Sequence, residues 1–161
     1  MKILGIDPGY ERVGIAVLEK KDREKETLIF SECFKTDAKL SFNDRLFLVG
    51  KEIDRVCSEF SPELLSIETL FFNTNQKSAI NVAEARGVII YEAKRHNLRV
   101  YEYSPLQIKN AVTGYGRATK NQVDIMVGQL MSIPKTVKQD DEMDAIAAAL
   151  TCFASYKNEA L

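Results

Sequence analysis

Ile3-Leu4-Gly5-Ile6-Asp7-Pro8-Gly9 is the stretch of sequence that decides the fold. A short apolar run that ends in Pro-Gly is typical of a buried strand followed by a turn. Asp7 therefore stands at the end of a buried strand, where an ionised carboxylate is costly unless something pairs with it. The simpler alternative is a turn aspartate that caps the backbone before Pro8-Gly9.

The order of the elements that follow predicts an α/β protein. Residues 13–18 and 27–34 form two further apolar runs joined by short links, which indicates an antiparallel meander with the strand over 3–7. Helical spacing predicts helices over 42–60 and 74–96, and strands are expected over 64–67 and 100–103. Ser104-Pro105, Thr119 and either Gln139 or Asp140 are expected to open three more helices. The sequence thus predicts a five-stranded mixed sheet, an antiparallel meander followed by parallel strands, with helices on both faces in a single domain over residues 1–161.

Three more acids occupy special places in this scaffold. Glu68 ends the apolar run over 64–67, whereas Asp141 and Asp144 lie three residues apart, in what we predict to be the first turn of an Ala-rich helix. Since crossover helices bring parallel strands side by side, Asp7 and Glu68 are expected at the same end of the sheet. Helix capping is the alternative explanation for the Asp141/Asp144 pair. Taken together, the four acids suggest that a divalent metal is their common partner. Ligands that offer only oxygen atoms favour Mg²⁺ or Mn²⁺.

Other kinds of active site are poorly supported. The chain has one histidine, His96, expected at a helix end, no P-loop motif, and three widely spaced cysteines that are typical of reduced core thiols. It has no apolar run long enough for a membrane span, and an acid comes too early for a signal peptide, so a cytoplasmic location is expected. Two cations about 4 Å apart on shared carboxylates hydrolyse phosphodiesters without a protein nucleophile.

The charge is unevenly distributed along the chain. Residues 86–138 hold nine Lys or Arg and three Asp or Glu, a net +6, although the whole chain carries −1. A basic stretch beside an acidic cluster suits an enzyme that holds cations and a polyanion together. Chance clustering on a solvated surface is the alternative.

Several of these motifs together resemble the RuvC family of Holliday junction resolvases. They are Gly5-Ile6-Asp7-Pro8-Gly9, Ile67-Glu68, Ala85-Arg86-Gly87, Gln107-Ile108-Lys109, the run from Gly114 to Lys120, and Asp141-x-x-Asp144-Ala145. The resemblance implies a ribonuclease H-like fold, a homodimer, and Mg²⁺-dependent paired nicking of four-way DNA junctions in recombination and repair. It also implies two Mg²⁺ per active site, with Mn²⁺ as a substitute, and a branch-migration helicase complex as a further partner.

The same resemblance assigns roles to individual residues. The catalytic and metal-binding positions match Asp7, Glu68, Asp141 and Asp144; the functional lysines match Lys109 and Lys120; and an aromatic after the second acid matches Phe71. Phe71-Phe72 either fill the core or stack on an unpaired base of the DNA. We expect Lys109, Arg117 and Lys120 to contact backbone phosphates, with Lys120 beside the scissile one. An Asp140/Asp144 pairing and a role for Phe72 in place of Phe71 remain open.

Three other functions are compatible with parts of this pattern. A YqgF-type nuclease and a sugar-kinase or actin-like ATPase have a similar opening strand, but such an ATPase needs a second domain for which 161 residues leave no room. A non-catalytic DNA-binding module is less favoured because all four acids are present. The small residues Ala79, Ala83 and Ala85 of the helix over 74–96 predict close packing, either in the core or at a two-fold interface.

Overall fold

The computed structural model describes residues 1–22, 24–70, 76–134, 136–137 and 139–156. These residues form one five-stranded sheet in the order β3-β2-β1-β4-β5. The strands are β1 (Lys2–Asp7), β2 (Arg12–Glu19), β3 (Thr27–Lys35), β4 (Leu64–Glu68) and β5 (Arg99–Tyr103). The mixed α/β fold predicted from the sequence is confirmed.

The pairing of β1 with its neighbours places two acids at one edge of the sheet. β1 pairs antiparallel with β2, and β2 pairs antiparallel with β3, whereas the β1–β4 and β4–β5 pairs are parallel. Ile6 of β1 pairs with Ile67 of β4. Asp7 and Glu68 are the next residues of these adjacent strands, so both emerge at the same edge, as predicted.

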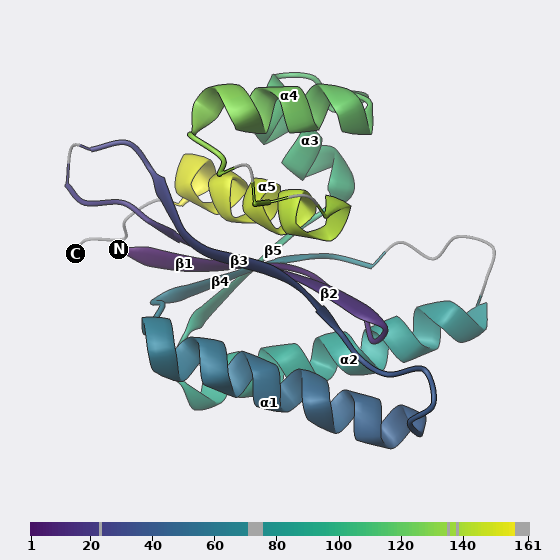
Figure 1. Cartoon of the computed structure of the whole chain (residues 1–161). Helices are drawn as coiled ribbons and strands as arrows, with labels where there is room; N and C mark the ends of the chain where they lie inside the picture. The colour runs from purple at the N-terminus through teal and green to yellow at the C-terminus, as the bar shows by residue number, and fades with distance from the viewer. Residues whose placement is uncertain (23, 71–75, 135, 138, 157–161) are drawn as a thin grey trace.

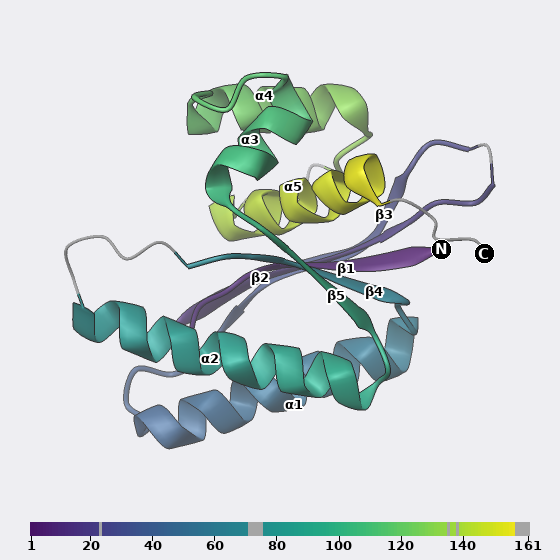
Figure 2. The same ribbon diagram turned by 180° about the vertical axis from the view of Figure 1, so that it is seen from behind.

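Helices cover both faces of the sheet. α1 (Phe42–Phe60) and α2 (Gln76–Arg95) lie on one face, and α3 (Pro105–Thr113), α4 (Lys120–Leu130) and α5 (Asp140–Ser155) lie on the other (Figures 1 and 2). Each face has its own apolar core, because successive side chains of a strand point to opposite sides. Leu4 and Ile6 pack towards α1 and α2, whereas Ile3 packs with the Ala-rich helix α5.

The helix ends follow local sequence signals. Ser104 and Thr119 accept hydrogen bonds from the backbone N–H groups of Gln107 and Gln122, which confirms both as N-caps. Helix α5 begins at Asp140, with Gln139 as its N-cap. Our placement of Asp144 in the first turn is therefore wrong: it is the fifth helical residue and lies in the second turn, beyond the N-terminal N–H groups that favour anions most.

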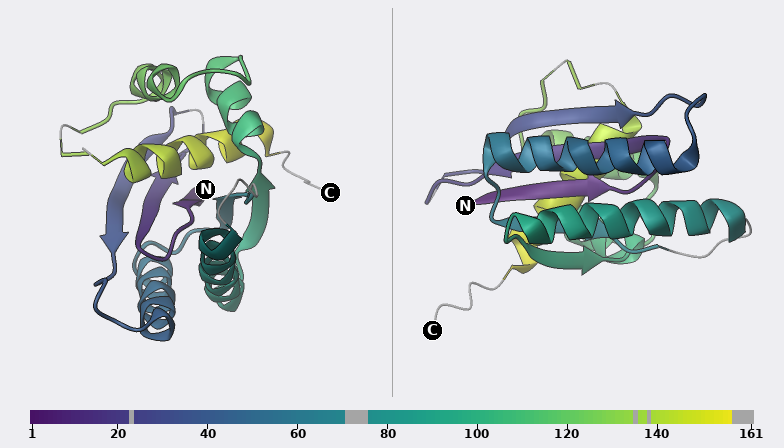
Figure 3. Two further views of the ribbon diagram at one scale, coloured as in Figure 1. Left: turned by 90° about the vertical axis from the view of Figure 1, so that its right-hand side faces the viewer. Right: turned by 90° about the horizontal axis from the view of Figure 1, so that it is seen from below.

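Two glycines allow α5 to lie directly on the sheet. A Cβ on Gly5 would stand 2.2 Å from the carbonyl oxygen of Ala145, and one on Gly14 would stand 2.0 Å from that of Asp141. The Ser66 hydroxyl also donates to the carbonyl of Ala148 at 2.6 Å. The view in the left part of Figure 3 shows α5 crossing the sheet. Because Gly14 pairs with Asp7, this contact sets the start of α5 beside the end of β1.

The two aromatic residues predicted to contact DNA, Phe71 and Phe72, lie outside the described residues. None of the described helices is long and apolar enough to cross a membrane.

Candidate active site

Asp7 and Glu68 are half-buried carboxylates at the ends of the two central parallel strands. Within the described residues, no group donates a hydrogen bond to either carboxylate. Burial, followed by the charges of Asp144, Glu68 and Asp141, raises the pKa of Asp7 to about 7. Burial and the charge of Asp144 raise the pKa of Glu68 to about 6, against the opposing effect of Lys109 and Lys120. These strand-end acids are therefore held close to other negative charge.

Asp144 projects from the second turn of α5 and is paired with a lysine. Its Oδ2 accepts a hydrogen bond from Nζ of Lys120, the first residue of α4, at 2.6 Å. Partial burial lowers the pKa of Lys120, but this hydrogen bond and the nearby acids outweigh it, so the pKa is raised overall. Lys120 therefore stays positively charged beside the acids.

Asp141, at the start of α5, is paired with a different cation from Asp144. Its Oδ2 accepts a hydrogen bond from Nη2 of Arg12 and lies 3.4 Å from the Cys33 thiol. Burial alone would raise the pKa of Asp141, but the hydrogen bond from Arg12 is among the contacts that lower it overall. Asp140, by contrast, is 79% exposed and only approaches Lys120, at 4.0 Å. The charge of Asp141 is among the causes of the raised pKa of Asp7.

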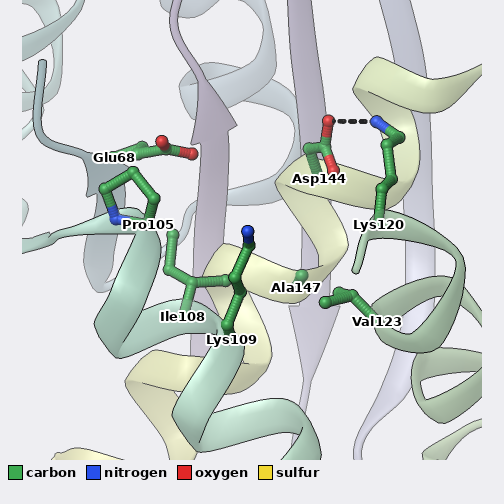
Figure 4. Close-up of a pocket in the computed structure, with 8 residues that line it drawn as sticks. All are labelled: Glu68, Pro105, Ile108, Lys109, Lys120, Val123, Asp144 and Ala147. Atoms are coloured by element: carbon green, nitrogen blue, oxygen red, sulfur yellow. Dashed lines mark hydrogen bonds and ion pairs between the residues drawn. The ribbon is translucent and has the colours of Figure 1, made fainter. Parts of the chain in front are cut away.

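A pocket opens between Glu68 at the end of β4 and helices α3, α4 and α5. It is lined by Glu68, Pro105, Ile108, Lys109, Lys120, Val123, Asp144 and Ala147. Figure 4 shows Glu68 on one side of this pocket, the Lys120–Asp144 pair on the other, and Lys109 rising from α3 between them. The pocket joins acidic and basic side chains above an apolar floor, as a site for cations and a polyanion requires.

Other predicted residues stand apart from this pocket. Arg117 is exposed in the α3–α4 loop, which begins at Gly114 with φ of 74°, and does not line the pocket. His96 lies just beyond α2 and its Nε2 is 2.7 Å from Asp54, so it takes no part in the site.

The acids do not form a ready metal cluster in this structure. Among the described residues, no three His, Cys, Asp or Glu side chains are grouped closely enough to hold a metal ion. Asp141 and Asp144 each direct a carboxylate oxygen to a side-chain cation, Arg12 and Lys120 respectively.

Sequence reasoning missed two residues that support the acids. Arg12 was not predicted as a site residue, although it is a cation that begins β2, just after the turn that follows Asp7. Arg86 of α2 donates from Nε to the carbonyl oxygen of Glu68 at 3.1 Å and pairs with Glu102 of β5. It thereby fixes the end of β4, and the Ala85-Arg86-Gly87 motif was the available signal.

Comparison with known proteins identifies the family. A family model described as "Crossover junction endodeoxyribonuclease RuvC" matches residues 3–152. The chain belongs to the RuvC family. This finding decides against the YqgF-type, ATPase and non-catalytic alternatives raised by the sequence, and it confirms the ribonuclease H-like fold that the resemblance implied.

Relatives in the RuvC family are similar over nearly the whole chain. The crossover junction endodeoxyribonuclease RuvC of Thermosipho melanesiensis is 45% identical over 149 residues, which cover 92% of this chain and 94% of the relative. That of Alkaliphilus oremlandii is 40% identical over 158 residues, which cover 98% and 95%. The structure of T. thermophilus RuvC in complex with Holliday junction substrate superposes with a TM-score of 0.87 at 31% identity, covering 94% of this chain and 92% of that one.

Proposed function

We propose that this chain is a structure-selective endonuclease that resolves four-way DNA junctions by paired, metal-dependent phosphodiester hydrolysis in recombination and repair. The observation that carries the proposal is the gathering of Asp7, Glu68 and Asp144 beside Lys109 and Lys120, in a member of the RuvC family. Acids and cations at one pocket suit a reaction between a bound metal and a phosphate diester.

The donor chemistry of the acids fits Mg²⁺. Asp7 and Glu68 are half-buried and have no hydrogen-bond donor among the described residues, so a cation would satisfy charge that the protein leaves unpaired. All four proposed ligands, Asp7, Glu68, Asp141 and Asp144, offer the hard oxygens that Mg²⁺ or Mn²⁺ prefers. Two such cations per site, when bound, activate a water and stabilise the leaving oxygen.

The cationic side chains hold the DNA backbone. Lys120 lies within hydrogen-bond distance of Asp144, and this proximity supports a role for Lys120 in neutralising charge on the scissile phosphate. Lys109 lines the same pocket and contacts a neighbouring phosphate. Arg117 extends this basic surface along the α3–α4 loop. Phe71 or Phe72, outside the described residues, stacks on an unpaired base at the crossover.

Paired nicking requires two sites, and we assign the dimer surface to the α1–α2 side of the sheet. There Phe47, Ile80 and Tyr91 are 66%, 55% and 63% exposed, an unusual group of large apolar side chains for a free surface. Ala85 is fully buried and belongs to the core, so the interface is formed by the outer side of α2. A C₂ dimer presents two identical sites to a two-fold junction.

We also propose, from the features of the sequence, that the protein acts in the cytoplasm and that residues 1–161 form a single domain. One further partner comes from the family resemblance. A branch-migration helicase complex is its expected partner on the junction.

Incubation with a synthetic four-way junction tests the proposed function. The protein is added with Mg²⁺ to junctions labelled on each strand in turn, and the nicks are mapped. We expect symmetric nicks on two opposing strands, and far slower cleavage of a linear duplex of the same sequence. Glu68→Gln is the control for contaminating nucleases. Equal cleavage of junction and duplex would refute the junction-resolving function.

A further inference from the structure

Both proposed metal ligands on α5 are already paired with side-chain cations in this structure. Lys120 is paired with Asp144, and Arg12 is paired with Asp141. The Arg12 contact is the more elaborate, because Nη2 also donates to Oε1 of Gln139, the N-cap of α5, at 3.0 Å. Arg12 thus joins the start of β2 to the start of the helix that carries two proposed metal ligands.

Arg12 competes for the oxygen that a metal would need. A guanidinium that donates to Oδ2 of Asp141 blocks that oxygen, and it adds positive charge beside a cation site. We propose that Arg12 is a releasable latch on Asp141, which opens when a DNA backbone phosphate takes the guanidinium and frees the carboxylate for metal. This inference rests on the proposed function.

The exposure of the pair allows the latch to open. The side chain of Arg12 is 47% exposed and that of Asp141 is 20% exposed, so solvent and DNA reach the contact. Ion pairs as exposed as this are weak and are readily exchanged. The planar guanidinium matches a phosphate as well as it matches a carboxylate. DNA binding and metal binding are therefore coupled through Arg12, and such coupling is reciprocal.

Metal affinity without DNA is the first test. Mn²⁺ binding to the full chain is measured by titration calorimetry at fixed ionic strength. Releasing a weak latch should make Arg12→Gln bind Mn²⁺ about two- to fivefold more tightly than the unmodified chain. Lys21→Gln is the matched control: it removes the same charge beyond the other end of β2, where Lys21 is 69% exposed, and should change nothing. Unchanged or weaker binding by Arg12→Gln would overturn the latch, and weaker binding would make Arg12 an orienting residue.

A second background separates the latch from simple charge repulsion. If Arg12 acts mainly through Asp141, most of the gain in Mn²⁺ affinity from Arg12→Gln should disappear when Asp141 is already Asn. A gain of the same size in the Asp141→Asn background would mean that Arg12 only repels the cation, and the latch would be rejected.

The DNA step is tested without metal. In the presence of a chelator, junction affinity is measured from low to moderate salt. Loss of one phosphate contact should reduce the slope of log affinity against log salt by about 0.9 in Arg12→Gln and leave it unchanged in Lys21→Gln. An unchanged slope in Arg12→Gln would remove the proposed trigger.

Failure of the latch and failure of the proposed function give different results. If the unmodified chain binds no Mn²⁺, or binds it equally well as Asp7→Asn, the metal site itself is wrong. If binding depends on Asp7 but not on Arg12, only the latch is wrong.

Discussion

Replacing Asp7 by Asn should inactivate the protein and at the same time stabilise it. The carboxylate of Asp7 is half-buried beside other acids, so ionising it in the metal-free protein is unfavourable. Asparagine is nearly the same size and carries no charge. We therefore expect Asp7→Asn to melt at a higher temperature than the unmodified chain above neutral pH.

The size of the effect follows from the pKa of Asp7. It is about 7 in the folded protein, against 3.8 for an unperturbed aspartate. Each tenfold change in a proton equilibrium corresponds to about 1.4 kcal/mol, which gives an upper bound of about 4 kcal/mol. Because solvent screens a half-buried side chain, we expect about 2 kcal/mol, or roughly 4–8 °C for a chain of this length.

The sign depends on pH. With the folded pKa above the unfolded one, the folded state holds its proton more tightly, so stability is lost as pH rises from about 4 to about 7 and is constant above that. The difference between Asp7→Asn and the unmodified chain should therefore be small at pH 4 and full at pH 8. Asp22→Asn, in the exposed β2–β3 turn, controls for the change in net charge.

Thermal melts with a chelator, at several pH values, measure this difference, and added Mg²⁺ or Mn²⁺ then tests its cause. Metal should raise the melting temperature of the unmodified chain at pH 8 by binding the native state, and should do so much less in Asp7→Asn. An Asp7→Asn protein that is less stable than the unmodified chain at pH 8 would refute the argument that Asp7 carries unpaired charge.

Three further outcomes are expected. Asp144→Asn should abolish cleavage of a labelled junction yet leave its binding in gel-shift assays largely intact, because basic residues supply most of the affinity; Asp140→Asn should remain active. Tyr91→Asp should convert dimers to monomers in light scattering, whereas Ile125→Asp, 51% exposed on α4 at the other face, should not. Gly14→Ala should displace the start of α5 and lower the free energy of unfolding, measured by denaturant, by about 1–3 kcal/mol. Its cleavage rate should fall by more than the fraction of unfolded protein accounts for.

The parts of this structure that could be predicted depend on short-range signals. Ser104-Pro105 and Thr119 cap helices through contacts three residues away, so the sequence reveals them directly. The shared edge of Asp7 and Glu68 follows from the parallel pairing that a crossover helix requires.

The contact between Arg12 and Asp141 could not be predicted in this way. The two residues are 129 positions apart, and they meet only because Gly14 lets the backbone of α5 approach β2. A glycine in a strand indicates close approach of another backbone, but not which one. The first residue of α5 was ambiguous for a different reason. Its start at Asp140 places Asp144 in the second turn, but the run of acidic residues alone does not show which of them begins the helix.

The four acids divide into two kinds by the element that carries them. The two proposed ligands on α5 each have an ion-pair partner, Arg12 for Asp141 and Lys120 for Asp144, whereas the strand acids Asp7 and Glu68 have none among the described residues. A helix start is exposed to approaching side chains from β2 and α4, but the ends of central strands are enclosed by their neighbours. Unfavourable negative charge is therefore concentrated at the strand ends. In the proposed function, a metal ion relieves most repulsion there, whereas Asp141 and Asp144 must first release their side-chain cations. The proposal therefore predicts that Asp7 and Glu68 determine whether metal binds, and that the two α5 ion pairs determine how its binding depends on DNA.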